Sequence, residues 1–188
     1  MDVVLMANPW RSTQTIGDLG QAMADWLEAR IPARPGYFDT RPDTETDHLI
    51  PTLARLCRGG YVTVDSQPGL EGPGHDGAHW RQKAYVEGYL DGRGPLLRQI
   101  LRAAEGAGMG TIRANRPPAT PVPFTDRDGQ PTSGITTRFP RNQLAREWDG
   151  IGRRAFRDLR AHGVHLVIYD PVWGRNDRLW PALTGAVR

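Results

Sequence analysis

Two short β-branched segments, each preceded by a helical pattern that ends in glycine, constrain the fold of this chain most. Tyr61-Val62-Thr63-Val64 follows Gly59-Gly60, and residues 164–169 follow His162-Gly163. Residues of this kind favour strands, and a glycine after a helical pattern marks the helix end. A helix that leads directly into a strand is typical of α/β folds. We therefore predict an α/β domain with a small, mainly parallel sheet flanked by helices.

The length of the chain predicts one domain over residues 1–188, because domains usually contain about 100–200 residues. A hydrophobic fraction of 38% is enough for a core, while 22 Gly and 16 Pro indicate many turns. No apolar run approaches the roughly 18 residues of a membrane span. The apolar opening at residues 3–7 is too short for a signal peptide. We expect a cytoplasmic protein that does not bind a membrane.

Apolar residues at helical spacing predict the remaining elements. The clearest helix begins at Thr15, where Thr15 and Asp18 have the spacing of a capping box. Pro51 is expected to bend or delay the helix that contains it. The pattern predicts helices over residues 15–30, 45–58, 80–90, 95–105 and 142–162, and further strands over residues 2–7 and 111–114.

Glycine and proline mark two irregular segments. Residues 65–78 contain four Gly and two Pro, which predicts a functional loop without regular structure. Asp128-Gly129 is a typical hairpin turn, here between predicted strands at residues 122–125 and 135–139. We expect this second segment to form a Pro/Gly-rich, hairpin-like insertion in the α/β domain.

Polar side chains follow both β-branched segments. Asp65 comes directly after the strand that ends at Val64, and Asp170 comes directly after the strand that ends at Tyr169. The carboxyl ends of parallel strands meet at one edge of a sheet, where open α/β sheets bind ligands. We predict that Asp65 and Asp170 are catalytic carboxylates, acting as general base or nucleophile. The alternative is that both aspartates only form turns after the strands.

Four more side chains complete the predicted site. Ser66 and Gln67 would orient a substrate, Trp173 would stack on its ring, and Arg81 would meet a negative group. The set suits a nucleoside or nucleotide. We predict no metal, because the segment holding His75 and His79 is too rich in glycine for a helix and lacks the glutamate of a zincin motif. The sequence identifies no cofactor.

Basic residues are numerous but nearly balanced by acidic ones. The chain carries 24 Lys and Arg against 21 Asp and Glu, a net charge of +3, and its one lysine is Lys83. The densest cluster consists of Arg153, Arg154, Arg157 and Arg160. A solvated helix face explains this cluster better than a nucleic-acid stripe, so a nucleic-acid partner is not expected. Cys57 and His165 are expected in the core.

The segment Gly60-Tyr61-Val62-Thr63-Val64-Asp65-Ser66-Gln67-Pro68-Gly69, preceded by Trp10, Asp18-Leu19 and Trp26-Leu27, carries a family resemblance. It resembles an uncharacterised family of actinobacterial and actinophage proteins with the signature Gly-Tyr/Phe-Val-Thr-x-Asp-Ser-Gln-Pro-Gly. The similarity covers about the first 90 residues, and Asp-Ser-Gln-Pro-Gly is its most specific part. The resemblance implies an actinobacterial or phage origin and brings no activity with it.

Two functional hypotheses follow. The first is a nucleoside- or nucleotide-like small-molecule binding protein or enzyme, with its site at the carboxyl ends of the strands ending at Val64 and Tyr169. The alternative is a non-enzymatic phage or mobile-element protein that binds a host protein through its Pro-rich residues 117–123. The six tryptophans discriminate between them. Exposure on one face would favour a host protein, and burial around a pocket would favour the small molecule.

Overall fold

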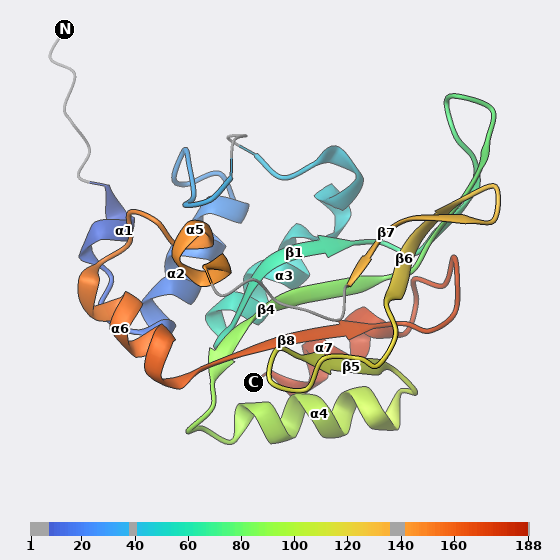
Figure 1. Ribbon diagram of the computed structural model, residues 1–188. Helices are drawn as coiled ribbons and strands as arrows, with labels where there is room; N and C mark the ends of the chain where they lie inside the picture. Colours follow the sequence, from blue (N-terminus) through green and yellow to red (C-terminus); the bar gives the residue numbers. More distant parts are fainter. Residues whose placement is uncertain (1–7, 38–40, 136–141, 188) are drawn as a thin grey trace, which may run out of the picture.

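A computed structural model describes residues 8–37, 41–135 and 142–187 (Figure 1). Its helices are α1 (Pro9–Ser12), α2 (Ile16–Leu27), the 3-10 helix η1 (Thr44–Leu49), α3 (Ile50–Arg58), α4 (Leu96–Gly106), α5 (Gln143–Glu147), α6 (Arg153–His162) and α7 (Leu179–Ala186). Its strands are β1 (Tyr61–Gln67), β2 (Leu70–Pro73), β3 (His79–Gln82), β4 (Tyr85–Asp91), β5 (Gly110–Arg113), β6 (Val122–Arg127), β7 (Gln130–Ile135) and β8 (Gly163–Tyr169). The strand predicted at residues 2–7 lies outside the described residues.

The strands form two sheets of four. Sheet A has the order β1-β4-β8-β5, and sheet B has the order β2-β3-β6-β7. Every neighbouring pair is antiparallel, so the prediction of a mainly parallel sheet is wrong. The physical reason is the connection between β1 and its neighbour β4. The chain between them forms the β2–β3 hairpin of sheet B instead of a helical crossover over sheet A, so β4 returns antiparallel to β1.

Residues 80–90 were predicted as a helix but form the end of β3 and most of β4. Side chains of β4 point alternately to the two faces of sheet A: Val86 and Leu90 enter the core, and Tyr85, Glu87 and Tyr89 point to the other face. This period of two is typical of a strand. The predicted loop at residues 65–78 is only half irregular, because residues 65–67 continue β1 and residues 70–73 form β2, while residues 74–78 form the turn between β2 and β3.

Several helix predictions are confirmed. Thr15 accepts a hydrogen bond from Asp18 N at 3.1 Å, and Asp18 Oδ2 accepts one from Thr15 N at 3.0 Å, which completes the capping box. Pro51 lies in the first turn of α3, after η1. The helix predicted over residues 142–162 is instead divided into α5 and α6 by a loop in which Gly150 has a φ of 88°, a conformation that favours glycine.

The β6–β7 hairpin turns at Asp128-Gly129, as predicted. Its second strand, β7, ends at Ile135, and residues 136–139 of the predicted strand lie outside the described residues. This hairpin belongs to sheet B and projects from the main body beside the β2–β3 hairpin (Figure 1). The insertion therefore contributes half of a second sheet.

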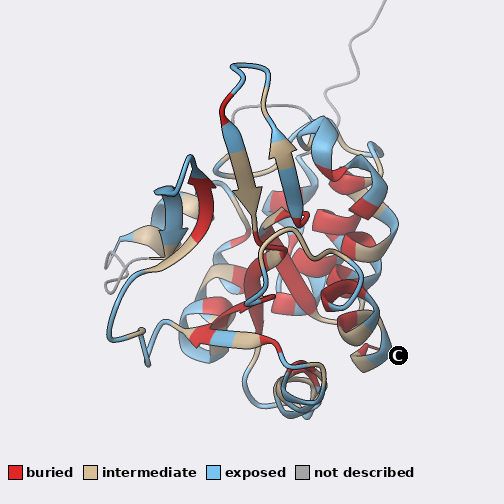
Figure 2. Cartoon of the chain, turned by 90° about the vertical axis from the view of Figure 1, so that its right-hand side faces the viewer, coloured by how far each residue is buried: buried red, intermediate tan, exposed pale blue. Residues whose placement is uncertain are grey.

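The main core lies on both faces of sheet A. Tyr89 contacts Trp148 on one face, and α4 and α7 cover the other. There the buried Val86, Leu90 and Ile168 join Ile100 of α4 and Leu183 of α7, and α4 runs below the sheet in Figure 1. Burial is concentrated in the strands of sheet A and the helix faces turned toward them, while the hairpin tips are exposed (Figure 2). Within the described residues, no helix combines the length and apolar character needed to cross a membrane.

We call the face of sheet A opposite α4 and α7 the polar face, defined by Asp65, Tyr85, Glu87, Tyr89 and His165. These residues share one side because directly paired residues of antiparallel strands point the same way, as Tyr89 and His165 do. Phe124 of sheet B packs against Val167 and Ile112 on this side, beyond the polar residues. The polar face therefore begins where the contact between the two sheets ends.

The carboxyl ends of β1 and β8 lie at the same end of sheet A. Each strand is antiparallel to β4, which runs between them, so β1 and β8 point in the same direction. Their last residues, Gln67 and Tyr169, both pair with Tyr85. The strand-end residues thus come together even though β1 and β8 are not neighbours.

Candidate functional site

A β-bulge in β1 decides which way Asp65 points. Thr63 pairs with Gly88, and Asp65 pairs with the next residue, Glu87, so Val64 is an extra residue in β1. In a regular strand Thr63 and Asp65 would share a face. The bulge turns Asp65 to the polar face instead, and bulges beside functional sites commonly redirect a side chain in this way.

The Asp65 carboxylate is held by two hydrogen bonds. Tyr85 Oη donates to Oδ2 at 2.6 Å, and the Ser66 backbone N–H donates to Oδ1 at 2.8 Å. The side chain keeps solvent access, yet the surrounding protein crowds it. This burial raises the pKa of Asp65, the Tyr85 hydrogen bond limits the rise, and the charge of Glu87 adds to it. A solvent-accessible carboxylate of this kind is suited to proton transfer.

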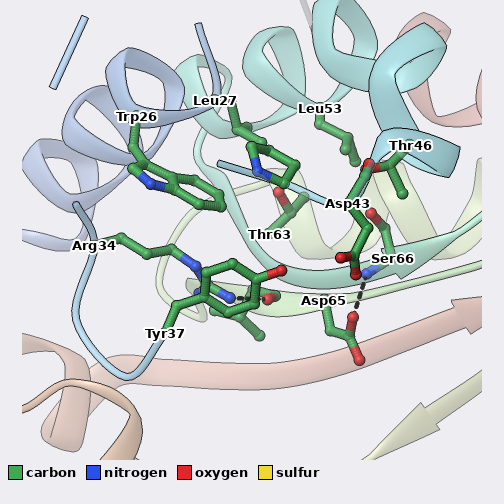
Figure 3. Close-up of a pocket in the computed structure, with 12 residues that line it drawn as sticks. Trp26, Leu27, Arg34, Tyr37, Asp43, Thr46, Leu53, Thr63, Asp65 and Ser66 are labelled. Carbon is green, nitrogen blue, oxygen red and sulfur yellow. Dashed lines mark hydrogen bonds between the residues drawn. The ribbon is translucent and has the colours of Figure 1, made fainter. Parts of the chain in front are cut away.

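Asp65 lies at a pocket beside β1 (Figure 3). Asp43, Ser66 and Asp65 lie next to one another on one side, and Trp26, Arg34 and Tyr37 stand on the other. The space open to water is about 50 Å³. A single water needs roughly 10–15 Å³, so the pocket admits a few waters or one end of a small ligand. The full lining is Trp26, Leu27, Arg34, Tyr37, Pro42, Asp43, Thr46, Leu53, Thr63, Val64, Asp65 and Ser66.

Arg34 joins the pocket wall to the bulge. Its guanidinium lies 5.0 Å from the ring centroid of Trp26 and 4.5 Å from that of Tyr37. Nη2 donates to the carbonyl of the bulge residue Val64 at 2.9 Å, whereas Nε has no hydrogen-bond partner among the described residues. Burial lowers the pKa of Arg34, but Glu147 and Asp65 oppose this effect, and an arginine stays charged in proteins.

Two further pairs continue along the polar face. His165 Nε2 and Glu87 Oε1 are 2.6 Å apart and buried, and Tyr89 Oη donates to Glu147 Oε2 at 2.7 Å. Burial raises the pKa of Glu147, and the Tyr89 hydrogen bond opposes the rise. The face and its rim are therefore rich in carboxylate oxygens. Glu87 and Glu147 already have partners within the protein, so Asp65 is the exposed carboxylate of this face and accepts hydrogen bonds from groups such as hydroxyls and amines.

The predicted site residues separate into four places. Asp65 and Ser66 line the pocket. Gln67 is buried and joins the two sheets: its Nε2 donates to the carbonyls of Lys83 and Phe124 at 2.9 and 3.0 Å, and its Oε1 accepts from Thr125 Oγ1 at 3.3 Å. These bonds leave the Gln67 amide no capacity to orient a substrate.

We expect Gln67→Leu to lower the free energy of unfolding by about 1–3 kcal/mol, because the Lys83 carbonyl then loses its buried donor. Urea denaturation followed by circular dichroism measures the change. Gln99→Leu on the exposed side of α4 makes the same substitution as a control and should change stability by less than about 0.5 kcal/mol. Equal effects of the two variants would contradict the bridging role of Gln67.

Asp170 is fully buried and neutralised by Arg175. Arg175 Nε contacts Oδ2 at 2.6 Å, Arg175 Nη2 contacts Oδ1 at 2.7 Å, and Val172 N donates to Oδ1 at 2.9 Å. These bonds fix the loop that follows β8. Asp170 does not line the pocket of Asp65, and its geometry is that of a loop anchor.

Arg81 and Trp173 also lie away from the Asp65 pocket. Arg81 forms an ion pair with Asp126 at 3.2 Å, and its guanidinium is 5.1 Å from the Trp173 ring centroid. Trp173 therefore faces cations of the protein itself. Neither residue lines the pocket at Asp65.

The sequence interpretation missed most of the pocket and most of the polar face beside it. Tyr85 and Glu87 were assigned to a helix, although their alternation with buried residues is a signal that could have placed them on one face. Arg34 and Asp43 lie in the loop between α2 and η1, where no periodicity points to a site. Among the described residues, no three His, Cys, Asp or Glu side chains are placed to hold a metal ion. His79 instead pairs with Glu71 at 3.2 Å.

Comparison with known proteins identifies a family but no activity. A family model described as "Domain of unknown function (DUF6919)" matches residues 6–188. No curated protein matches the chain. An uncharacterised family was expected from the sequence, and the match extends it from about the first 90 residues to nearly the whole chain.

Proposed function

The chain belongs to the DUF6919 family of domains of unknown function, and from its geometry we propose that it binds a small polar molecule of the nucleoside type beside β1, with Asp65 as proton acceptor. One observation carries the proposal. A bulge turns Asp65 into a pocket where the carboxylate keeps solvent access while its pKa is raised. Carboxylates with shifted pKa values in clefts are concentrated at functional sites.

The two sides of the pocket suit the two parts of a nucleoside. Asp43, Asp65 and Ser66 offer oxygens on one side, and carboxylates and hydroxyls accept hydrogen bonds from sugar hydroxyls. Tyr37 and the guanidinium of Arg34, which are partly exposed, present planar groups on the other side, and such groups stack on bases. Trp26 is buried and contacts Arg34. Because the open space is about 50 Å³, only the hydroxyl-bearing edge of the sugar enters the pocket, and the base lies at its mouth.

The positions of the tryptophans support this proposal over a host-protein partner. Trp10, Trp26, Trp148 and Trp180 are buried, with at most 6% of their surface exposed, and Trp80 and Trp173 are half-buried. Trp26 lines the pocket itself. Partner surfaces are anchored by aromatic residues that are accessible before binding, so these tryptophans offer poor anchors.

A thermal-shift screen tests the proposed function. We expect a nucleoside at about 100 times its dissociation constant to stabilise the protein by about 2.7 kcal/mol, which raises Tm by roughly 5–10 °C. Adenosine, guanosine, cytidine, uridine and free ribose form the panel. Asp149→Asn, which changes an exposed aspartate without a hydrogen-bonded side chain among the described residues, should show the same shift. A flat screen of the wild type would contradict the proposal.

Two further expectations from the sequence, on the origin of the family and on the location of the protein, remain proposals. An actinobacterial or actinophage origin of the family rests on the segment Gly60 to Gly69. A cytoplasmic location is likewise kept as a proposal. Neither is needed for the proposed site.

A further inference from the structure

Lys83, the one lysine of the chain, is held unlike an ordinary surface lysine. It lies between β3 and β4 and is 8% exposed. Its N–H donates to the Phe124 carbonyl at 2.9 Å, and its carbonyl accepts from Gln67 Nε2 at 2.9 Å. The backbone at Lys83 is thereby fixed to both sheets, so the side chain extends from a rigid point.

The ammonium of Lys83 lies against aromatic rings. Nζ is 4.4 Å from the ring centroid of Trp173 and 5.9 Å from that of Tyr169. Across the part of the chain that the structure describes, Lys83 forms no ion pair. The neighbouring carboxylates have other partners, since Asp126 pairs with Arg81 at 3.2 Å and Asp170 with Arg175 at 2.6 Å.

Arg81 brings a second positive charge to the same ring. Its guanidinium is 5.1 Å from the Trp173 centroid. It uses Nε and Nη2 on Asp126, which leaves Nη1 available. Burial, and then the charge of Arg81, lower the pKa of Lys83. Two cations beside one carboxylate leave an excess positive charge, which favours an anion with several oxygens.

We infer that Lys83, together with Arg81 and Trp173, binds a phosphate group. Phosphate can offer one oxygen to Lys83 Nζ and another to Arg81 Nη1, and its charge compensates the excess. This site goes beyond the proposed function and does not depend on it. A row of aromatic contacts separates the two sites. Tyr85, which binds Asp65, stacks on Phe124 at 4.4 Å. Phe124 makes a tilted contact at 5.4 Å with Tyr169, the ring that Lys83 Nζ approaches.

The single lysine makes the test direct. Protein labelled with 13Cε-lysine gives one side-chain NMR signal, from Lys83. We expect inorganic phosphate and ribose 5-phosphate to shift this signal saturably, while sodium chloride at equal ionic strength does not. Tighter binding of the ester would identify the phosphate group of a small molecule as the ligand, and equal binding would identify free phosphate.

Variants separate this site from the Asp65 pocket. In calorimetric titrations with inorganic phosphate, Lys83→Gln should weaken binding roughly tenfold or more, because a charge-assisted hydrogen bond is lost. Lys83→Arg should retain most of the affinity. Arg98→Gln removes the same charge from an exposed position on α4 and, like Asp65→Asn, should leave phosphate binding unchanged. The inference would be overturned if phosphate shifted the Lys83 signal no more than sodium chloride does. It would also be overturned if Lys83→Gln bound phosphate with the affinity of the wild type.

Discussion

Arg175→Ala is expected to lower the free energy of unfolding by about 3–5 kcal/mol, the usual effect of removing one partner of a buried ion pair. Arg175 binds both carboxylate oxygens of Asp170, and the Asp170 side chain is fully buried. Without Arg175, the carboxylate keeps the Val172 N–H as a donor but loses its compensating charge. Urea denaturation followed by circular dichroism at pH 7 measures the loss.

Two controls make this prediction specific. Arg178→Ala removes the same side chain from an exposed position three residues later and should change stability by less than about 0.5 kcal/mol. Adding Asp170→Asn to Arg175→Ala removes the uncompensated charge and should recover part of the loss. If Arg175→Ala were as stable as Arg178→Ala, the loop after β8 would not be held by this ion pair.

Asp65→Asn is expected to weaken nucleoside binding roughly tenfold or more while leaving Tm at neutral pH nearly unchanged or slightly higher. The variant removes the charged acceptor that faces the ligand. The amide oxygen can still accept from Ser66 N, and the amide NH2 in place of Oδ2 can donate to Tyr85 Oη, whose hydroxyl rotates to accept. The variant also removes a carboxylate that burial disfavours in its charged form. If Asp65 had only a structural role, Asp65→Asn would lower Tm, and the folded protein would bind the nucleoside with unchanged affinity.

The same variant should change how stability depends on pH. The folded-state pKa of Asp65 is raised above its ordinary value, which is about 3.9. The protonated carboxyl therefore contributes stability that is fully present below about pH 3.9 and is lost as the pH rises through the folded-state pKa. Relative to Asp65→Asn, the wild type should lose Tm over that interval. Glu147, whose pKa is also raised, is present in both proteins and does not contribute to the difference.

Local patterns predicted much of the fold but not how the strands pair. The capping box at Thr15, the turn at Asp128-Gly129 and the β-branched segment before Tyr169 each depend on neighbours in the chain, and all three are present. Strand direction depends on the connection between partners. A helix at residues 80–90 would provide the crossover that a parallel pair requires. Because this segment was predicted as a helix, the sheet was predicted with the wrong pairing.

The candidate site was only partly accessible from sequence for a related reason. Asp65 and Ser66 could be found because they follow a β-branched segment. The bulge at Val64, which turns Asp65 to the polar face, results from pairing with β4 and has no local signal. Arg34 reaches Val64 from 30 residues away, so only the folded chain brings it to the pocket.

The most direct test of the central claim is a calorimetric titration of the nucleoside that gives the largest thermal shift. Wild type, Asp65→Asn and Asp149→Asn are titrated at pH 7 under identical conditions. We predict saturable binding to the wild type, the same dissociation constant for Asp149→Asn, and a dissociation constant raised roughly tenfold or more for Asp65→Asn. Equal dissociation constants for all three proteins would contradict the assignment of the pocket at Asp65 as the ligand site.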